Sequence, residues 1–522
     1  MKEAVGRRKH VSRVARDQRL RALLGVALGL ALLVIVNAVV RQPSGGAAGG
    51  QFVGAPSLPV VQMTKPGDWR CPGPLPVGAG KESSRISIVN IGTSAVNLLV
   101  VVSRTGLPRG GVSSGASISR ARFQVGGEAQ AVLPLTTRGP AGFAAVTIKA
   151  DAGGIGVGES IVGGSIVGGS AAGAPVELSS PCSLVAAAQG YVPTGSTYGG
   201  SDVRLSLYDP DATPAVVNVS VSTGTTLTSP PAFQGVVVPA TGLVVLDLHR
   251  WVFDQGSLAV TATAVSGVVV VGALELTSET VDVTSRSAAG HPISHVRVIG
   301  SSLLVGPARG LSHWAFAAMQ SRKGVASTFS VYNPGKRPVS VSVAPPGRAG
   351  IVAALTEDVP AGGIVDFATP VTGKSGLGTG SVVISAKGGM PVVVARLTTR
   401  YRTRFLEDID ATPGTAGPRD EWLLPGASLT SRIDDVVTIE DPGTEGSTVT
   451  LLELTHGTAA RSRLEVVDLS AGSELEVNLG SVLKNAPLFA LSVSASVPIL
   501  VEQQLTPRGG LTAAAGGIPV LG

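Results

Sequence analysis

One pattern, an alternating strand followed by a turn and a second alternating strand, occurs four times in this chain and restricts the folds it can adopt. In its clearest copy, residues 327–343, apolar residues alternate with serine on both sides of Asn333-Pro334-Gly335. Alternation with a period of two is typical of a strand that buries one face. Proline disfavours the helical region for the residue before it and glycine accepts a positive φ, so the tripeptide is expected to reverse the chain.

The other copies have their turns at Asn90, Asp209-Pro210 and Asp441-Pro442-Gly443, so successive turns lie 119, 124 and 108 residues apart. This spacing is the size of a domain. An aromatic residue opens each copy, and a further turn and an apolar strand close it. The opening aromatic residues, which we expect to anchor the cores of four repeats, are Trp69, Tyr191, Trp314 and Trp422.

The fold class predicted from these repeats is all-β. The 522 residues include 69 glycines and 35 prolines, with 44% hydrophobic and only 15% charged residues, which favours short strands and tight turns around large cores. Alternating sheet faces need a partner sheet, so each repeat of about 110 residues suits an immunoglobulin-like β-sandwich. A solenoid has a shorter repeat period than about 110 residues, and a propeller blade is smaller than a unit of this size, so neither architecture fits the spacing. The strand order stays open.

The basic character of the chain is confined to its first 21 residues. This tail holds eight Lys or Arg against two Asp or Glu, which accounts for the whole net charge of +6 and leaves the remaining 501 residues neutral. A site for a polyanion would have to be built from that neutral remainder, so we expect no nucleic-acid binding.

Residues 22–40 form an uncharged apolar stretch of 19 residues in which Asn37 is the only strongly polar member. As a helix it would be about 28 Å long, enough to cross a bilayer core. Positive charge precedes it, so the N terminus should be cytoplasmic and the bulk of the chain extracytoplasmic. A cleaved signal peptide is the alternative, but its apolar region is normally shorter and no Ala-x-Ala site follows closely. We favour an uncleaved signal-anchor helix in the cell membrane.

Cys71 and Cys182 are the only cysteines of the chain. In an exported protein they predict one disulfide, which would join the start of the first repeat to the segment that leads into the second. Two isolated thiols without a histidine cluster argue against a metal site, and no cofactor is expected.

These features divide the chain into eight parts. They are a cytoplasmic tail (1–21), a transmembrane helix (22–40), a linker rich in Gly and Pro (41–66), four repeats (67–182, 183–300, 301–410 and 411–510) and a tail (511–522).

Three motifs resemble catalytic sites but lack the required setting. Ser113 lies in a Gly-x-Ser-x-Gly sequence without the strand-to-helix turn that a nucleophile elbow needs. His291 and His295 have helical spacing, but Pro292 between them favours a loop. Gly373-Lys374-Ser375 lacks the first glycine of a phosphate-binding loop. We therefore expect no catalytic residues.

Two carboxylates and a glycosylation sequon have simpler interpretations. Glu159 and Glu502 follow the final apolar strands of their repeats and could act as an acid and a base. Their equivalent placement instead favours solvated strand ends. Asn218-Val219-Ser220 matches the N-glycosylation sequon but lies inside an alternating strand, in which burial of the valine explains it.

Aromatic residues make up only 4% of the chain, which leaves few rings for stacking on a ligand. Trp69, Trp314 and Trp422 are explained as core anchors. Trp251 falls outside the repeat pattern, so it is the candidate for a ligand contact.

The joint order of these motifs resembles that of a family of exported actinobacterial proteins defined by a domain of unknown function. The likeness rests on the basic tail and anchor, the Trp-x-x-Pro-Gly sequence of 422–426, the Asn/Asp-Pro turns, the Val-Pro-Ala-Gly turn of 359–362 and the closing Gly517-Ile518-Pro519. It would cover most of residues 67–520, and it implies an envelope location without an established activity.

The sequence therefore predicts a non-catalytic scaffold or docking protein of the cell envelope. Its partner would be an envelope protein. A cell-wall glycan-binding module is the alternative, and an exported hydrolase is a third. Function is expected to reside in what differs between the four copies.

Overall fold

The computed structural model of the protein describes most of one compact unit, Pro56–Gly522. The described residues are 58–78, 83–113, 115–135, 140–163, 176–286, 292–319, 324–345, 355–368, 380–402, 405–427, 433–455, 457, 461–483, 488–507 and 512–521. The predicted cytoplasmic tail, transmembrane helix and most of the linker lie outside them. Over these ranges, the search for a helix with the length and hydropathy of a membrane span finds none.

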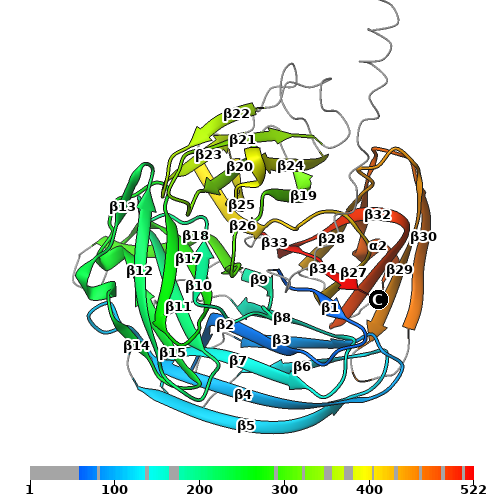
Figure 1. Cartoon of the computed structure of the whole chain (residues 1–522), viewed down its shortest axis with the longest axis horizontal. Coiled ribbons are helices and arrows are strands. Elements are labelled where there is room, and N and C mark those ends of the chain that lie inside the picture. The colour runs from blue at the N-terminus through cyan, green and yellow to red at the C-terminus, as the bar shows by residue number, and fades with distance from the viewer. Residues whose placement is uncertain are drawn as a thin grey trace, which may run out of the picture. The chain divides into compact units, whose positions relative to one another are not determined.

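The described chain is almost entirely β-strand and contains four sandwiches in sequence order (Figure 1). The strands of the first are β2 (Asp68–Val77), β3 (Ser83–Asn90), β4 (Val96–Gly106), β5 (Ala116–Val125), β6 (Ala129–Pro134), β7 (Gly142–Ala150), β8 (Ile155–Gly163) and β9 (Val176–Pro181). The second comprises β10 (Gln189–Val192), β11 (Ser201–Asp209), β12 (Ala215–Thr223), β13 (Thr226–Thr228), β14 (Val236–Val238), β15 (Gly242–Asp247), β16 (Ala259–Ser266), β17 (Val270–Arg286) and β18 (Pro292–Val305).

The third and fourth sandwiches repeat this succession. The third has β19 (His313–Met319), β20 (Val325–Tyr332), β21 (Val339–Ala344), β22 (Leu355–Val359), β23 (Ile364–Ala368), β24 (Gly380–Ala386), β25 (Val393–Arg402) and β26 (Phe405–Pro413). The fourth has β27 (Arg419–Ala427), β28 (Ile433–Glu440), β29 (Ser447–Thr455), β30 (Arg461–Leu469), β31 (Glu474–Asn478), the short helix α2 (Leu479–Val482), β32 (Phe489–Pro507) and β33 (Ala513–Gly516).

All four sandwiches share one strand order. Numbered within a copy, strands 1-6-3-4 form one antiparallel sheet and strands 5-2-7-8 form the other, as in β2-β7-β4-β5 and β6-β3-β8-β9. In the fourth copy the long β32 serves as strands 6 and 7. The predicted β-sandwich repeats are thus confirmed. Their order differs from that of immunoglobulin domains, in which the first, second, fifth and fourth strands share a sheet. Alternation along a strand does not reveal its neighbour, so the sequence left this open.

Three of the four predicted core anchors are buried between the sheets of their own sandwiches: Trp69, Trp314 and Trp422 are each at most 1% exposed. The prediction is wrong for Tyr191, which is 6% exposed but packs against the third sandwich, with its ring centroid 6.3 Å from that of Tyr332. The alternating residues of strands 2 and 3 face the tryptophans, as the pattern predicts: in the third sandwich Phe329, Val331, Val339, Val341 and Val343 all belong to its core.

The repeated turn is a buried side-chain-to-backbone motif. The Oδ1 atoms of Asn90, Asp209, Asn333 and Asp441 each accept a hydrogen bond from the backbone N–H two residues later, at 2.8 to 2.9 Å. All four side chains are at most 1% exposed. This bond mimics a backbone turn, which explains why only Asn and Asp occur there.

Within this unit the four sandwiches contact one another in a closed cycle. Their eighth strands meet in turn, β9 with β18, β18 with β26, β26 with β33 and β33 with β9, in the central part of Figure 1. In the second, third and fourth copies, the residue before the repeated turn forms a hydrogen bond with the preceding sandwich. The Tyr208 hydroxyl bonds Thr147, the Tyr332 hydroxyl bonds Thr261, and Glu440 accepts a hydrogen bond from Ser381.

The fourth sandwich contacts the first through the ends of the described chain. The strand β1 (Val61–Gln62) pairs in parallel with β34 (Ile518–Leu521), which itself pairs with β27. These segments fall in the predicted linker and the predicted C-terminal tail, so those two assignments need correction. Both strands are too short for their periodicity to be recognised, and their pairing joins residues that are far apart in sequence.

Candidate interaction surface

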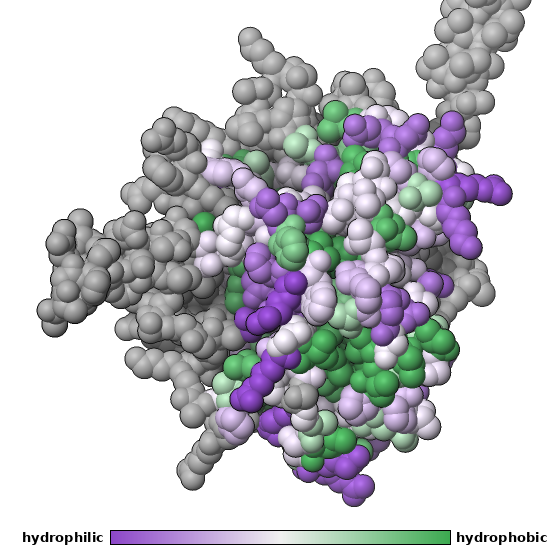
Figure 2. Space-filling model, turned by 90° about the vertical axis from the view of Figure 1, so that its left-hand side faces the viewer, coloured by the Kyte–Doolittle hydropathy of each residue, from purple (hydrophilic) through white to green (hydrophobic). Residues whose placement is uncertain are grey.

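The second sandwich exposes more large apolar side chains than the others. Among the described residues, eleven large hydrophobic side chains are exposed, and six of them belong to this sandwich. Figure 2 views the molecule from this side and shows hydrophobic residues gathered in the lower half of the view. We call the six exposed side chains of the second sandwich the apolar surface; they are Tyr198, Leu227, Val237, Trp251, Phe253 and Val265. The loops of Tyr198, Trp251 and Phe253 lie where β16 begins, and Val237 and Val265 lie where it ends. A large exposed apolar area is typical of an interaction site.

Three members of the apolar surface are aromatic and lie on two hydrogen-bonded loops. Tyr198 is in the loop between β10 and β11, and Trp251 and Phe253 are in the loop between β15 and β16. The backbone N–H of Asp254 donates to the carbonyl oxygen of Thr197 at 3.3 Å, which ties the loops together. The Tyr198 and Phe253 side chains are 61% and 63% exposed, so this loop pair presents its rings to solvent.

Trp251, the candidate ligand contact from the sequence, is 42% exposed. Its ring meets the buried Phe233 edge to face, with centroids 6.2 Å apart. Its Nε1 edge lies against Gly111 of the first sandwich, where an added Cβ atom would come within 2.6 Å of that nitrogen. The indole is therefore held on two sides while part of it faces solvent. A contact residue that is already fixed loses little conformational freedom on binding.

Two of the aliphatic members lie together on the outward face of the outer sheet. Val237 of β14 is paired with the half-buried Val216 of β12, and Val265 is the bulged residue where β16 passes Val216. Val237 and Val265 are 60% and 67% exposed. The burial of apolar area that these side chains offer favours a protein partner, because a glycan has few apolar groups to cover them.

The predicted glycosylation sequon lies on the same strand as Val216. The side chain of Asn218 is half-buried, and its Oδ1 accepts a hydrogen bond from the N–H of Gly235 at 2.7 Å. Val219 is fully buried, as the strand interpretation predicts. The asparagine therefore holds the connection between β12 and β14.

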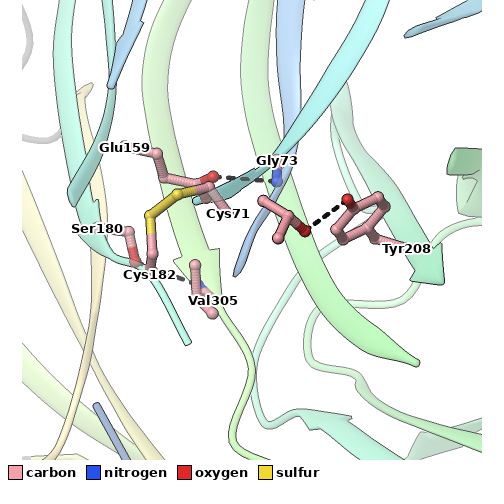
Figure 3. Close-up of a disulfide and its surroundings, with 8 residues drawn as sticks. Cys71, Gly73, Glu159, Ser180, Cys182, Tyr208 and Val305 are labelled. Atoms are coloured by element: carbon pink, nitrogen blue, oxygen red, sulfur yellow. Dashed lines mark hydrogen bonds between the residues drawn. A yellow bond between two sulfur atoms is a disulfide. The ribbon is translucent and has the colours of Figure 1, made fainter. Parts of the chain in front are cut away.

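The predicted disulfide is present. Cys71 and Cys182 are joined inside the first sandwich, and Glu159 lies beside them (Figure 3). The Glu159 Oε2 accepts a hydrogen bond from the Gly73 N–H at 3.1 Å. Burial raises the pKa of Glu159 to about 8, against the opposing effect of this bond. The sulfur atoms are bonded to each other, so they are not available as thiolate ligands of a metal.

The interpretation of Glu159 and Glu502 as solvated strand ends is wrong. Glu159 is fully buried, because it alternates with Val157 and Ile161 on the core face of β8. Glu502 is 5% exposed and forms an ion pair with Arg396 of the third sandwich. The two carboxylates belong to different sandwiches and different surroundings.

Ser113 is a structural residue at the contact between the first two sandwiches. It is 6% exposed, its Oγ accepts from the Val245 N–H at 2.7 Å, and Thr105 donates to it at 3.1 Å. Neither partner is a base that could activate a nucleophile. His291 and Gly373-Lys374-Ser375 lie outside the described residues, as does the side chain of His295.

No family model and no curated protein matches this chain. Three solved structures are similar at low scores. The Thermotoga maritima 1070 protein is 14% identical over 20% of this chain and 97% of its own, with a TM-score of 0.19. The Anabaena sensory rhodopsin transducer is 17% identical over 16% of this chain and 95% of its own, with a TM-score of 0.15. The BSP domain of a biofilm associated protein is 9% identical over 84% of this chain and 90% of its own, with a TM-score of 0.13. At these TM-scores none of the likenesses bears on function.

Proposed function

We propose that this protein is a non-catalytic docking scaffold of the bacterial cell envelope. Residues 22–40 would anchor it as an uncleaved helix, with the N terminus in the cytoplasm and the four sandwiches outside. The observation that carries the docking role is the apolar surface of the second sandwich. The other sandwiches share its strand order, and their described residues include few exposed large apolar side chains, such as Ile118 or Val466.

The chemistry of the apolar surface supports an envelope protein as the partner. It combines valine side chains at one end of β16 with rings on two loops at the other end. Aromatic anchors of this type dominate the binding energy of protein interfaces. The partner's surface would be apolar at its centre and would cover Trp251 and Phe253.

A cell-wall glycan is the second candidate ligand, favoured by the three exposed rings. Sugars stack on aromatic faces and make little use of exposed valines. The two candidates therefore differ in which side chains matter. Loss of polysaccharide retention in Trp251→Ala with full retention in Val237→Ser would favour the glycan.

The docking role can be tested with the tagged full-length protein expressed in its source cells. Partners enriched with the wild type are compared with those enriched with Phe253→Ser/Val265→Ser and with the control Val466→Ser on the fourth sandwich. A partner that is retained by the control and lost by the double variant supports the proposal. A partner set that is the same for all three proteins contradicts it.

The location is tested separately by the mass of the mature protein. An intact N terminus in the membrane fraction supports the anchor, whereas a chain that begins after residue 40 replaces the anchor by a cleaved signal peptide. Hydrolysis of peptidoglycan, esters or peptides by the full-length protein, abolished by Ser113→Ala, would contradict the non-catalytic role.

A further inference from the structure

A buried carboxyl group of the first sandwich lies beside both sulfur atoms of the disulfide. A carboxyl oxygen of Glu159 and the sulfur atoms of Cys71 and Cys182 all lie within 4.8 Å of one another (Figure 3). All three side chains are fully buried. We call these residues the cysteine–glutamate group, because cysteine and glutamate are two of the side chains that bind metal ions in proteins.

One oxygen of Glu159 is left without a hydrogen bond. Its Oε2 accepts from the Gly73 N–H, but its Oε1 has no hydrogen-bond partner in the described part of the chain. A disulfide has no N–H, O–H or S–H group, so the bridge beside this oxygen cannot supply a donor. A buried polar atom without a partner lowers stability and calls for an explanation.

The sandwich fold itself does not require a carboxyl group at this position. Glu159 pairs with the strand-2 residue four positions before the repeated turn. The residues that pair in the same way in the other copies are Ala273, Arg396 and Gln503. The alanine has no polar side chain, and the arginine and the glutamine both have side-chain partners. The glutamate therefore occurs in the one copy that also contains the cysteines.

The group is held together by backbone bonds that do not depend on the disulfide. Next to the cysteines, Arg70 and Ser183 exchange both of their backbone hydrogen bonds, at 2.7 and 2.8 Å. The Cys182 N–H donates to the Val157 carbonyl oxygen at 3.0 Å. Glu159 lies in β8, which is paired on both sides, with β3 and with β9. Reduction of the disulfide would thus leave two thiols and a carboxyl group in one place.

Two thiolates and a carboxylate suit zinc. Zn²⁺ prefers a tetrahedral set of sulfur, nitrogen and oxygen ligands, and with Zn–S bonds of about 2.3 Å two bound sulfur atoms lie about 3.8 Å apart. The Cα atoms of Cys71 and Cys182 are 4.6 Å apart, so rotation of the two released side chains can reach this separation. Magnesium and calcium prefer ligand sets made of oxygen only. A water molecule would supply the fourth ligand.

We propose that the reduced protein binds one zinc ion through Cys71, Cys182 and Glu159, and that the disulfide and the zinc site are alternatives, because the same sulfur atoms form both. A trialkylphosphine and water convert the disulfide into two thiols and the phosphine oxide. Zinc then displaces the two thiol protons and the carboxyl proton, which pass to solvent. The site is independent of the apolar surface and of the docking role.

The proposal is tested on the full-length protein after reduction with tris(2-carboxyethyl)phosphine and removal of the reductant and of metals without oxygen. Titration with zinc against a chromophoric chelator should show one more zinc ion per chain for the reduced protein than for the oxidised protein. Cobalt(II) should give a thiolate-to-metal charge-transfer band with the reduced protein only, and zinc should abolish this band by displacing the cobalt. Zinc should also slow the alkylation of both cysteines, because their sulfur atoms are then bound.

Two matched variants test the carboxyl group. Glu159→Gln preserves the size of the side chain, and it should weaken zinc binding by the reduced protein at least about tenfold, because a ligand is lost. Glu177→Gln removes another buried carboxyl group of the first sandwich, which lies outside the cysteine–glutamate group, and should leave the affinity unchanged.

The wild-type measurements decide the proposal even if a variant fails to fold. Equal zinc binding by the reduced and oxidised proteins, or zinc binding without the cobalt–thiolate band, would overturn it. Equal zinc affinities of folded Glu159→Gln and the wild type would also overturn it, since the carboxylate would then not be a ligand.

Discussion

Arg396 of the third sandwich and Glu502 of the fourth form an ion pair in which both side chains are buried, at 2% and 6% exposure. The Arg396 Nη1 donates to the Glu502 Oε2 at 2.9 Å and to the Ala317 carbonyl oxygen at 2.6 Å. Burial raises the pKa of Glu502 although Arg396 opposes the shift. Nearby, the carboxylates of Asp408 and Asp410 accept hydrogen bonds from the N–H groups of Thr512 and Ala514. This part of the contact between the two sandwiches is thus polar and buried, beside an apolar part in which Ala315 and Ala317 join the core of the fourth sandwich.

Removing one partner of this pair should destabilise the protein strongly, since the other charge is left buried. We expect Glu502→Ala to lower the free energy of unfolding by about 3 to 5 kcal/mol, as measured by urea denaturation. The control Lys149→Ala removes the exposed pair with Asp68 and should change it by less than about 1 kcal/mol. The apolar double variant Arg396→Met/Glu502→Leu should recover most of the loss. Equal, small effects of Glu502→Ala and Lys149→Ala would contradict this account.

The four buried turns predict a stabilising substitution. In the third copy the Asn333 Nδ2 donates to the carbonyl oxygens of Arg337, Val359 and Pro360. In the fourth copy the Asp441 Oδ2 has no hydrogen-bond partner in the part of the chain that is described. An amide at this position can donate where a carboxylate cannot. Asp441→Asn should therefore raise the free energy of unfolding by about 1 kcal/mol, which is measured as a higher midpoint of urea denaturation.

The reverse change is the matched control for that prediction. Asn333→Asp should lower stability by about 1 to 3 kcal/mol, because three carbonyl oxygens lose their donor and a charge is buried. Opposite signs for the two substitutions support the shared turn geometry. A loss of stability in Asp441→Asn would show that the fourth turn differs from the third.

The repeats, the sandwich class and the buried tryptophans could be predicted from the sequence, because alternation and turn residues act within one repeat. The burial of Glu159 could also have been predicted, because it alternates with Val157 and Ile161 and so lies on the same face of the strand. Its position at the end of an apolar run, from which we predicted exposure, was less informative. The contacts between sandwiches could not be predicted, since the pairing of Arg396 with Glu502 depends on how whole repeats pack.

The candidate surface was predicted only in part. Trp251 stands out as a tryptophan outside the repeat pattern. Tyr198 lies in a loop and Val237 in an apolar strand, and the sequence does not distinguish exposed from buried side chains of these types, so only the structure identifies them as exposed. Phe253 could have been found from its nearness to Trp251 in sequence.

Stability should fall as the pH rises from about 4.5 to about 8. Burial raises the pKa of Glu159 to about 8, and those of Glu275 and Asp410 to about 7. In the unfolded chain such carboxyls titrate near pH 4. The folded protein thus binds more protons across this interval, so deprotonation favours unfolding.

Thermal unfolding monitored at pH 5.5 and pH 8 tests this directly. The unfolding temperature should be higher at pH 5.5, and Glu159→Gln should reduce the difference by removing the group with the highest of these pKa values. The fourth sandwich already has a glutamine at the equivalent position, because Gln503 pairs with Val437 there as Glu159 pairs with Ile86 in the first sandwich. An unfolding temperature that rises between pH 5.5 and pH 8 would contradict the protonated state of these carboxyls.

The disulfide should contribute substantially to stability. Its cysteines are 111 residues apart, and closing a loop of that length stabilises the folded state by about 4 to 5 kcal/mol on the chain-entropy model. Cys71→Ser/Cys182→Ser should lower the urea midpoint to the value of the wild type in a strong reductant. A wild-type midpoint that does not change on full reduction would contradict this expectation.

The docking role of the second sandwich is tested most directly by photocrosslinking in intact cells. A photoreactive phenylalanine analogue replaces Phe253 of the apolar surface in one protein and Val466 of the fourth sandwich, which is 47% exposed, in another. We predict that the analogue at position 253 forms one discrete covalent adduct with a single envelope protein, and that Trp251→Ala lowers the yield of this adduct. The analogue at position 466 should form no adduct. Absence of an adduct at 253, or the same adduct at both positions, would contradict the proposed function.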